Sequence, residues 1–215
     1  MMTRRELLWA AAGIPVLAAS QEFWNEKPPD QWTKAEIEQL LTQSPWAKPA
    51  AVSFKNSVGN LAPGFGRYGV YSPPGTIDQG KNAGKSLAFQ ATLRWETALP
   101  VRLAEKNHAF DGSQYYVLAA VGDFPATNDA NEDIAARQQR REMLQEFTKL
   151  ERRGDSPLYL DRVESIATGM RFYFQKLEPI TLANKELAFT TKIGPLELKA
   201  KFPLKDMVYR GQLEL

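Results

Sequence analysis

Cysteine is absent from this chain of 215 residues, and histidine occurs only once, as His108. Without cysteine the protein has no disulfide, no thiol nucleophile and no thiolate metal site, so core packing alone must hold the fold together. With one histidine, a carboxylate site for a hard cation such as calcium is the one metal site that remains chemically open. The sequence also contains no G-x-S-x-G segment or other recognisable hydrolase signature. We therefore expect no cofactor.

An excess of one charge is missing as well. The chain has 27 lysines and arginines against 25 acidic residues, for a formal net charge of +2. Neither sign forms a long block, whereas proteins that bind nucleic acid usually carry a basic patch or stripe. We therefore predict no nucleic-acid partner.

Long apolar runs are also missing. The longest candidate covers residues 7–19, which is shorter than the roughly 20 residues that span a bilayer. It follows Arg4 and Arg5 in the segment TRRELL, which resembles the twin-arginine export consensus, and small residues precede a cleavage site after Ser20. We predict that residues 1–20 are an export signal, that the protein is periplasmic or secreted, and that no stable membrane span remains after cleavage. Sec export and an uncleaved N-terminal anchor are the alternatives.

Tryptophan is concentrated just after the predicted cleavage site. Residues 23–48 hold three of the five tryptophans, which are Trp24, Trp32 and Trp46. Thr33 and Glu36 fit a capping box, so we predict a helix after Thr33 that ends near Ser44. Because a helix of about ten residues is unstable alone in water, its apolar face must pack onto the rest of the domain. We interpret the tryptophans as core residues, with an aromatic ligand platform as the alternative.

The remainder of the chain is rich in predicted strands. Alternating apolar and polar residues predict strands at 50–55, 86–97, 114–121, 158–166, 169–175, 187–192, 196–202 and 209–215. Residues 147–152 fit a strand or the end of a helix, and we favour the strand. Helices are predicted from Thr97, as N-cap, to about Lys106 and from residue 128 to about 145.

This order of elements lacks regular βαβ alternation. It indicates an α+β fold, with a mostly antiparallel sheet and with the short N-terminal helix and one or two further helices packed on one face. We predict that residues 21–215 form a single domain.

Glycine and proline are concentrated at about residues 57–85, which we predict to be a loop. Seven of the fourteen glycines lie there. Two of its segments are similar to nucleotide-binding motifs. GFGRYG at 64–69 lacks a preceding strand and a following helix, and GKNAGKS at 80–86 is one residue too short and leads into a predicted strand. Neither segment predicts a nucleotide site.

Four polar residues are the weak candidates for a catalytic site. They are Glu96, Arg102, His108 and Asp111. His108 has the chemistry of a general base and Asp111 is its only local carboxylate partner, while Glu96 and Arg102 could line a cleft. An exposed loop histidine is the alternative. The acidic residues at 123, 129, 132 and 133 lack the spacing of a calcium loop, and we interpret them as the polar start of a helix.

Several segments of the chain resemble a group of uncharacterised exported bacterial proteins. The similar segments are FWNEKP at 23–28, WT at 32–33, SPWAK at 44–48, LRWE at 93–96, and the tail from GPLE at 194–197 through KDM at 205–207. The resemblance spans most of the mature chain and implies export and a single domain. It carries over no catalytic residue.

We therefore predict an exported monomer that acts as a non-catalytic binding or cell-envelope structural module. Its expected partner is a protein or small ligand in the envelope. The alternative is a periplasmic hydrolase or ligand-binding enzyme with a site near Glu96, Arg102, His108 and Asp111.

Overall fold

The structure is a computed structural model that describes residues 22–54, 90–106, 114–122, 124, 133–194 and 196–215. Several predictions lie outside these residues: the export signal at 1–20, the glycine-rich stretch at 57–85, and the candidates His108 and Asp111. In the part that is described, helices and antiparallel sheets occur together, which confirms the α+β class.

The described helices, with three short 3-10 turns among them, are α1 (Phe23–Glu26), η1 (Pro29–Gln31), α2 (Lys34–Thr42), α3 (Leu99–Glu105), α4 (Ile134–Phe147), η2 (Leu182–Asn184) and η3 (Leu204–Asp206). The strands are β1 (Ala47–Pro49), β2 (Ala51–Phe54), β3 (Ala91–Trp95), β4 (Tyr115–Gly122), β5 (Lys149–Arg152), β6 (Leu158–Tyr159), β7 (Arg162–Ile166), β8 (Gly169–Gln175), β9 (Glu186–Ile193), β10 (Leu196–Pro203), β11 (Val208–Tyr209) and β12 (Gln212–Leu213).

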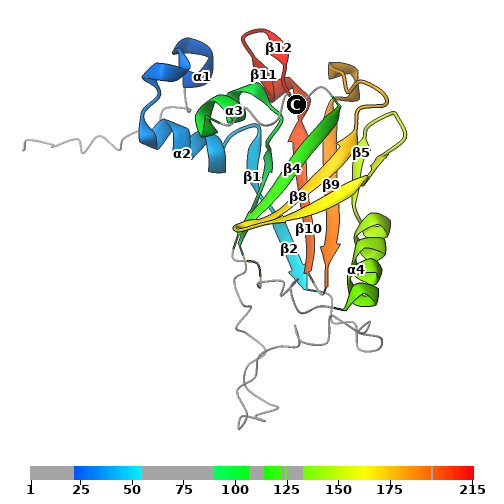
Figure 1. Ribbon diagram of the computed structural model, residues 1–215. Helices are drawn as coiled ribbons and strands as arrows, with labels where there is room; N and C mark the ends of the chain where they lie inside the picture. The colour runs from blue at the N-terminus through cyan, green and yellow to red at the C-terminus, as the bar shows by residue number, and fades with distance from the viewer. Residues whose placement is uncertain (1–21, 55–89, 107–113, 123, 125–132, 195) are drawn as a thin grey trace, which may run out of the picture.

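Ten of these strands form two five-stranded sheets, and the chain passes from one sheet to the other at both edges (Figure 1). One sheet has the order β1-β3-β4-β8-β7 and the other β2-β10-β9-β5-β6, and all pairs are antiparallel. Only Ala50 separates β1 from β2, and only two residues separate β6 from β7. The two sheets are therefore joined through the chain at both edges, and we call them together the barrel.

Aromatic side chains fill the space between the two sheets. Trp95 on β3 meets Phe202 on β10 at a ring-centroid distance of 5.7 Å, and Phe172 on β8 meets Phe189 on β9 at 5.2 Å. All four are fully buried. Their edge-to-face geometry is the arrangement that aromatic pairs prefer in cores. The interior of the barrel is thus a packed core.

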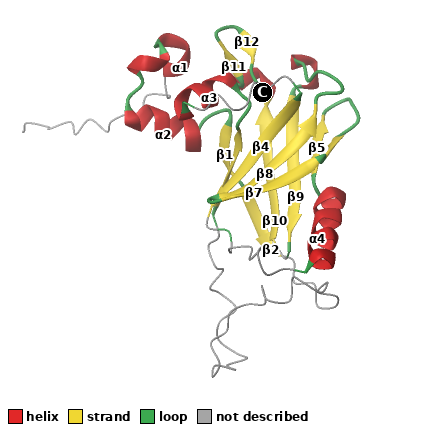
Figure 2. Cartoon of the chain, in the orientation of Figure 1, coloured by secondary structure: helices red, strands yellow, loops and turns green. Residues whose placement is uncertain are grey.

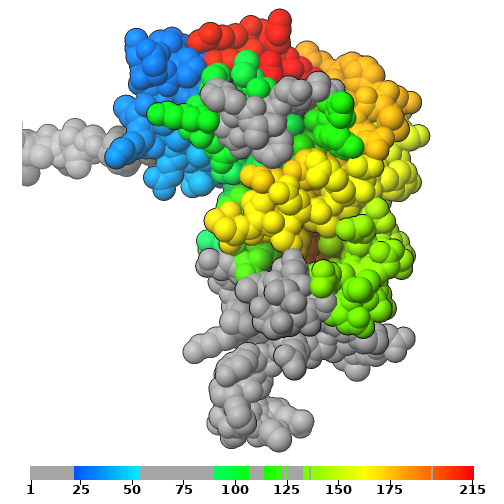
Figure 3. Space-filling model, viewed as in Figure 1, coloured from blue at the N-terminus to red at the C-terminus, as the bar shows by residue number. Residues whose placement is uncertain are grey.

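The first helices and the last two strands form a cap at one end of the barrel (Figure 2). In α2, the Thr33 side chain accepts from the Glu36 backbone N–H at 3.2 Å, and Glu36 Oε2 accepts from the Thr33 N–H at 2.8 Å, which confirms the predicted capping box. Asn25, in the short α1, donates to the Val208 carbonyl at 3.4 Å and accepts from the Arg210 N–H at 2.8 Å. The start and the end of the described chain therefore lie side by side, as blue and red in Figure 3.

The tryptophans of the cap are core residues, as predicted. Trp24, Trp32 and Trp46 are 3%, 7% and 0% exposed. Trp24 packs edge-to-face on Trp46 at 5.6 Å, and Phe23 bridges Trp24 and Trp32. These rings present too little surface to act as a ligand platform.

The helix α4 lies beside β9 on the other side of the barrel (Figure 1). Leu144 is its buried contact, and Gln145 Nε2 donates to the Asp161 carbonyl at 3.2 Å. Most of its other side chains are exposed and polar, as is usual for a helix at the surface of a domain. Residues 149–152 form β5, so the strand that we favoured for the following segment begins just after the helix ends.

Three predicted elements differ in detail. Ala98, not Thr97, is the N-cap of α3, because the Thr97 hydroxyl accepts from the Val117 N–H in β4 at 3.2 Å. The predicted strand 158–166 is divided into β6 and β7, which pair in different sheets. The predicted strand 209–215 is a hairpin, since Arg210 and Gly211 have positive φ angles of 48° and 82° and reverse the chain.

Candidate functional site

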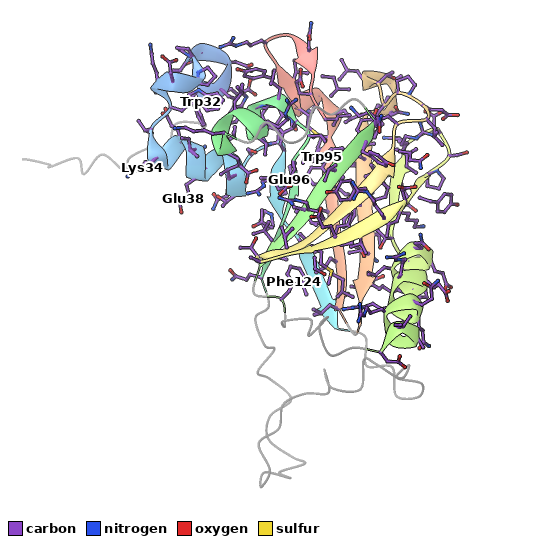
Figure 4. The ribbon with its side chains drawn as sticks, in the orientation of Figure 1. Trp32, Lys34, Glu38, Trp95, Glu96 and Phe124 are labelled. Atoms are coloured by element: carbon purple, nitrogen blue, oxygen red, sulfur yellow. The ribbon has the colours of Figure 1, made fainter. Side chains whose placement is uncertain are left out.

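Glu96 lies directly after β3, on the outer side of its sheet, while its neighbour Trp95 points into the core (Figure 4). Its side chain is 1% exposed, although carboxylates are rarely buried without partners. Glu96 Oε1 accepts from Arg94 Nη2 at 3.1 Å, and Oε2 accepts from Arg171 Nε at 2.6 Å. Two arginines from different strands thus hold this carboxylate.

Sheet register explains why these groups meet. Arg94 on β3 pairs with Ala119 on β4, Ala119 pairs with Arg171 on β8, and Arg171 pairs with Glu164 on β7. Paired residues lie on the same face, so these four side chains form a line across the sheet. The alanine at its centre is fully buried and has only a methyl group, which leaves room for both arginines above it.

Ion pairs connect the charged residues of this line and extend it to α3. Arg94 Nη2 lies 2.5 Å from Glu105 Oε1 on α3, and Arg171 Nη1 lies 3.8 Å from Glu164 Oε2. We call Glu105, Arg94, Glu96, Arg171 and Glu164 the charge row. Beyond it, the Tyr173 hydroxyl donates to Glu164 Oε2 at 2.5 Å, and the Arg162 guanidinium lies 3.7 Å from the centroid of the Tyr173 ring.

Burial and pairing shift several pKa values in this region. Burial raises the pKa of Glu105, and the charge of Arg94 opposes part of that effect. Burial disfavours the charge on Arg171 and is the largest single effect, but the hydrogen bond to Glu96 and the charges of Glu96 and Glu164 together outweigh it, so the pKa of Arg171 is raised. Burial and the hydrogen bond to Glu164 raise the pKa of Tyr173 to about 12.

These contacts limit what Glu96 can do chemically. A general base must be reached by a substrate proton, and the Glu96 side chain is 1% exposed with both oxygens accepting from guanidinium groups. With Arg162 included, the row contains three carboxylates and three guanidinium groups, so its charges balance. The geometry is that of a structural ion-pair network that joins α3, β3, β8 and β7.

Arg102, the other described candidate, lies on α3 one helical turn before Glu105. The ion pairs of Glu96 come instead from Arg94 and Arg171, which the sequence reasoning did not select. Arg94 lies two residues before Glu96 in a strand, so period-two spacing was the available signal for that pair. Arg171 is 75 residues from Glu96, and no local pattern identifies it.

Two surface pockets lie in the cap. One, of about 440 Å³, lies between η1, α3 and the β11–β12 hairpin, and Leu99, Leu103, Tyr209 and Arg210 contribute to its lining. The other, of about 400 Å³, lies near Trp24 and Lys48. The charge row lines neither pocket.

Neither a cluster of metal ligands nor a membrane-spanning helix occurs within the described ranges. There, no group of three or more histidine, aspartate or glutamate side chains is arranged to hold a metal ion. Across the same residues, no helix combines the length and the apolar character needed to cross a bilayer.

Comparisons with known proteins give no relative from which a function could be transferred. No family model, no curated protein and no solved structure matches the chain.

Proposed function

We propose that the protein is an exported, non-catalytic module that binds a partner or ligand in the cell envelope. The observation that supports this most directly is the state of Glu96, whose two oxygens are both held by arginines. The packed interior of the barrel supports it too, because buried side chains fill that interior and both pockets lie at the surface. Resemblance to exported bacterial proteins supports the cellular location.

The proposed lack of catalysis is tested by replacing His108, the only histidine in the sequence. Purified mature protein, residues 21–215, is incubated with chromogenic ester, peptide and glycoside substrates, beside a His108→Gln variant. We expect no turnover by either protein. Turnover by the wild type that is lost in a His108→Gln variant with an unchanged melting temperature would overturn the proposal in favour of a hydrolase.

Export is tested independently by cell fractionation. Replacing Arg4 and Arg5 by Lys should retain the protein inside the cell if the twin-arginine route is used. A double variant that is still exported would identify the Sec route, and a wild-type protein that stays in the cytoplasm would contradict export itself.

A further inference from the structure

The larger pocket, between η1, α3 and the β11–β12 hairpin, has the size and lining of a small-molecule site. Its volume of about 440 Å³ falls in the range of roughly 300–1,000 Å³ that such sites occupy. Leu99, Leu103 and Pro29 supply apolar surface, and Tyr209, Arg210 and Glu214 supply polar groups. A few polar groups around an apolar wall are typical of sites that orient a ligand.

Tyr209, one of the residues that line this pocket, has an unused hydrogen-bonding group. The residue is 4% exposed, and its hydroxyl is buried without a hydrogen-bond partner among the described residues. Leaving a buried hydroxyl unpaired is unfavourable, and native proteins usually avoid it. A ligand acceptor in the pocket would satisfy this hydroxyl.

Arg210 brings a guanidinium group to the lining of this pocket. Its guanidinium lies 5.2 Å from the centroid of the Tyr209 ring, and it forms no ion pair with any residue that the structure describes. The one carboxylate in the lining, Glu214, accepts from the Leu99 N–H at the start of α3, at 3.4 Å. The pocket therefore has a cation at its rim.

The backbone at Arg210 favours a different residue. Its φ of 48° lies in the left-handed region, where two-residue hairpin turns usually have Asn, Asp or Gly. An arginine at a position whose backbone conformation disfavours it indicates a role for the Arg210 side chain.

We propose that this pocket binds a small organic anion with an apolar body. This inference rests on the proposed binding function and specifies its ligand class. The carboxylate of the ligand pairs with Arg210 and accepts from the Tyr209 hydroxyl, and the apolar body packs on Leu99 and Leu103. The positive rim and the apolar wall together select an amphiphilic anion over a neutral or cationic analogue.

The test uses 3-phenylpropionate as the probe, with binding measured by calorimetry and by amide chemical shifts of the mature protein. We expect saturable binding with shifts in α3 and the hairpin, and at least ten-fold weaker binding of the neutral 3-phenylpropanamide and the cationic 3-phenylpropylamine. Equal binding of the three compounds, or no binding of the acid, would overturn the anion assignment. If the anion assignment fails, a partner captured from envelope extract would still support the proposed binding function. Failure of the ligand class and failure of the binding function can therefore be distinguished.

Arg210→Asn removes the cation and keeps a residue suited to the turn. We expect at least a ten-fold loss of affinity for the acid, with a melting temperature equal to or above that of the wild type. Lys185→Asn is the matched control, because Lys185 is also an exposed cation with a positive φ, of 59°, but lies outside the pocket. Equal losses in both variants, or unchanged affinity in Arg210→Asn, would contradict the proposal.

Tyr209→Phe separates hydrogen bonding from packing. The ring stays and only the unpaired hydroxyl is lost, so we expect weaker binding of the acid without a lower melting temperature. Unchanged affinity would show that the hydroxyl does not contact the ligand and would contradict this part of the assignment.

Discussion

The indole Nε1 of Trp46 donates a hydrogen bond of 2.9 Å to the backbone carbonyl of Glu214, 168 residues away. Trp46 is fully buried, and its own carbonyl accepts from the Trp95 N–H at 2.9 Å. One residue thereby connects the N-terminal helices, the strand β3 and the end of the chain. Because Trp46 and Glu214 are far apart in the sequence, their contact forms only in the folded chain, where it holds the cap to the barrel.

Replacing Trp46 by Phe should lower the free energy of unfolding by about 2–4 kcal/mol, because it leaves the Glu214 carbonyl without its donor and creates a cavity. Urea unfolding measures the loss, and hydrogen exchange should show faster opening of β11 and β12. Trp32→Phe is the matched control. The Trp32 indole donates only to the nearby Lys27 carbonyl, at 3.2 Å, so its loss should cost less. Equal losses in the two variants would contradict a special role for the Trp46 contact.

Glu96→Gln should destabilise the fold strongly. It removes the negative charge between Arg94 and Arg171 while keeping the size of the side chain, and breaking a buried pair in this way typically costs about 3 kcal/mol or more. Chemical denaturation measures the change. Glu151→Gln is the control, because the Lys149–Glu151 pair has side chains 43% and 49% exposed and should contribute less than about 1 kcal/mol. A loss below 1 kcal/mol at Glu96 would show that the charge row adds little to stability.

Local patterns were sufficient to predict several elements. The capping box of α2 depends on Thr33 and Glu36, three residues apart, and β8 shows its alternation within seven residues. Such signals are contained in the sequence because the interactions themselves are local.

Tertiary contacts account for what local patterns missed. The Thr97 hydroxyl has the chemistry of a helix cap, but the neighbouring strand β4 uses it instead. Arg171 reaches Glu96 only because β3, β4 and β8 pair in one register. The hairpin at Arg210 and Gly211 was read as a strand because Arg is an uncommon residue at such a turn.

The ion pair between Lys27 and Glu36 should make stability depend on acid pH. The hydrogen bond from Lys27, followed by that from the Thr33 N–H, lowers the pKa of Glu36 from 4.5 to about 2. A carboxyl whose pKa is lowered by folding stabilises the protein above its unfolded pKa, and this stabilisation is lost as the pH falls. The difference in unfolding free energy between wild type and Glu36→Gln should therefore be constant above pH 4.5 and shrink towards pH 2.

The measurement is urea unfolding across that pH range. Glu38→Gln serves as the control, because Glu38 is an exposed residue of the same helix and forms no side-chain contact with any described residue (Figure 4). Its effect over the same range is the reference with which that of Glu36→Gln is compared. A pH-independent difference at Glu36 would contradict the lowered pKa.

Tyr173 should make stability depend on alkaline pH. Burial, followed by the hydrogen bond to Glu164, raises its pKa from 10.0 to about 12. The unfolded chain then loses the phenol proton at a lower pH than the folded protein, so the stabilisation is complete below pH 10 and is lost as the pH rises towards 12.

In the folded protein, Tyr173→Phe should remove amplitude from the last part of the tyrosinate absorbance change. Tyr159→Phe is the control for the loss of one tyrosine, since Tyr159 is 67% exposed. If the late absorbance change persists in full in Tyr173→Phe, the phenol is not held by Glu164, and the contact between Tyr173 and the charge row does not form in solution.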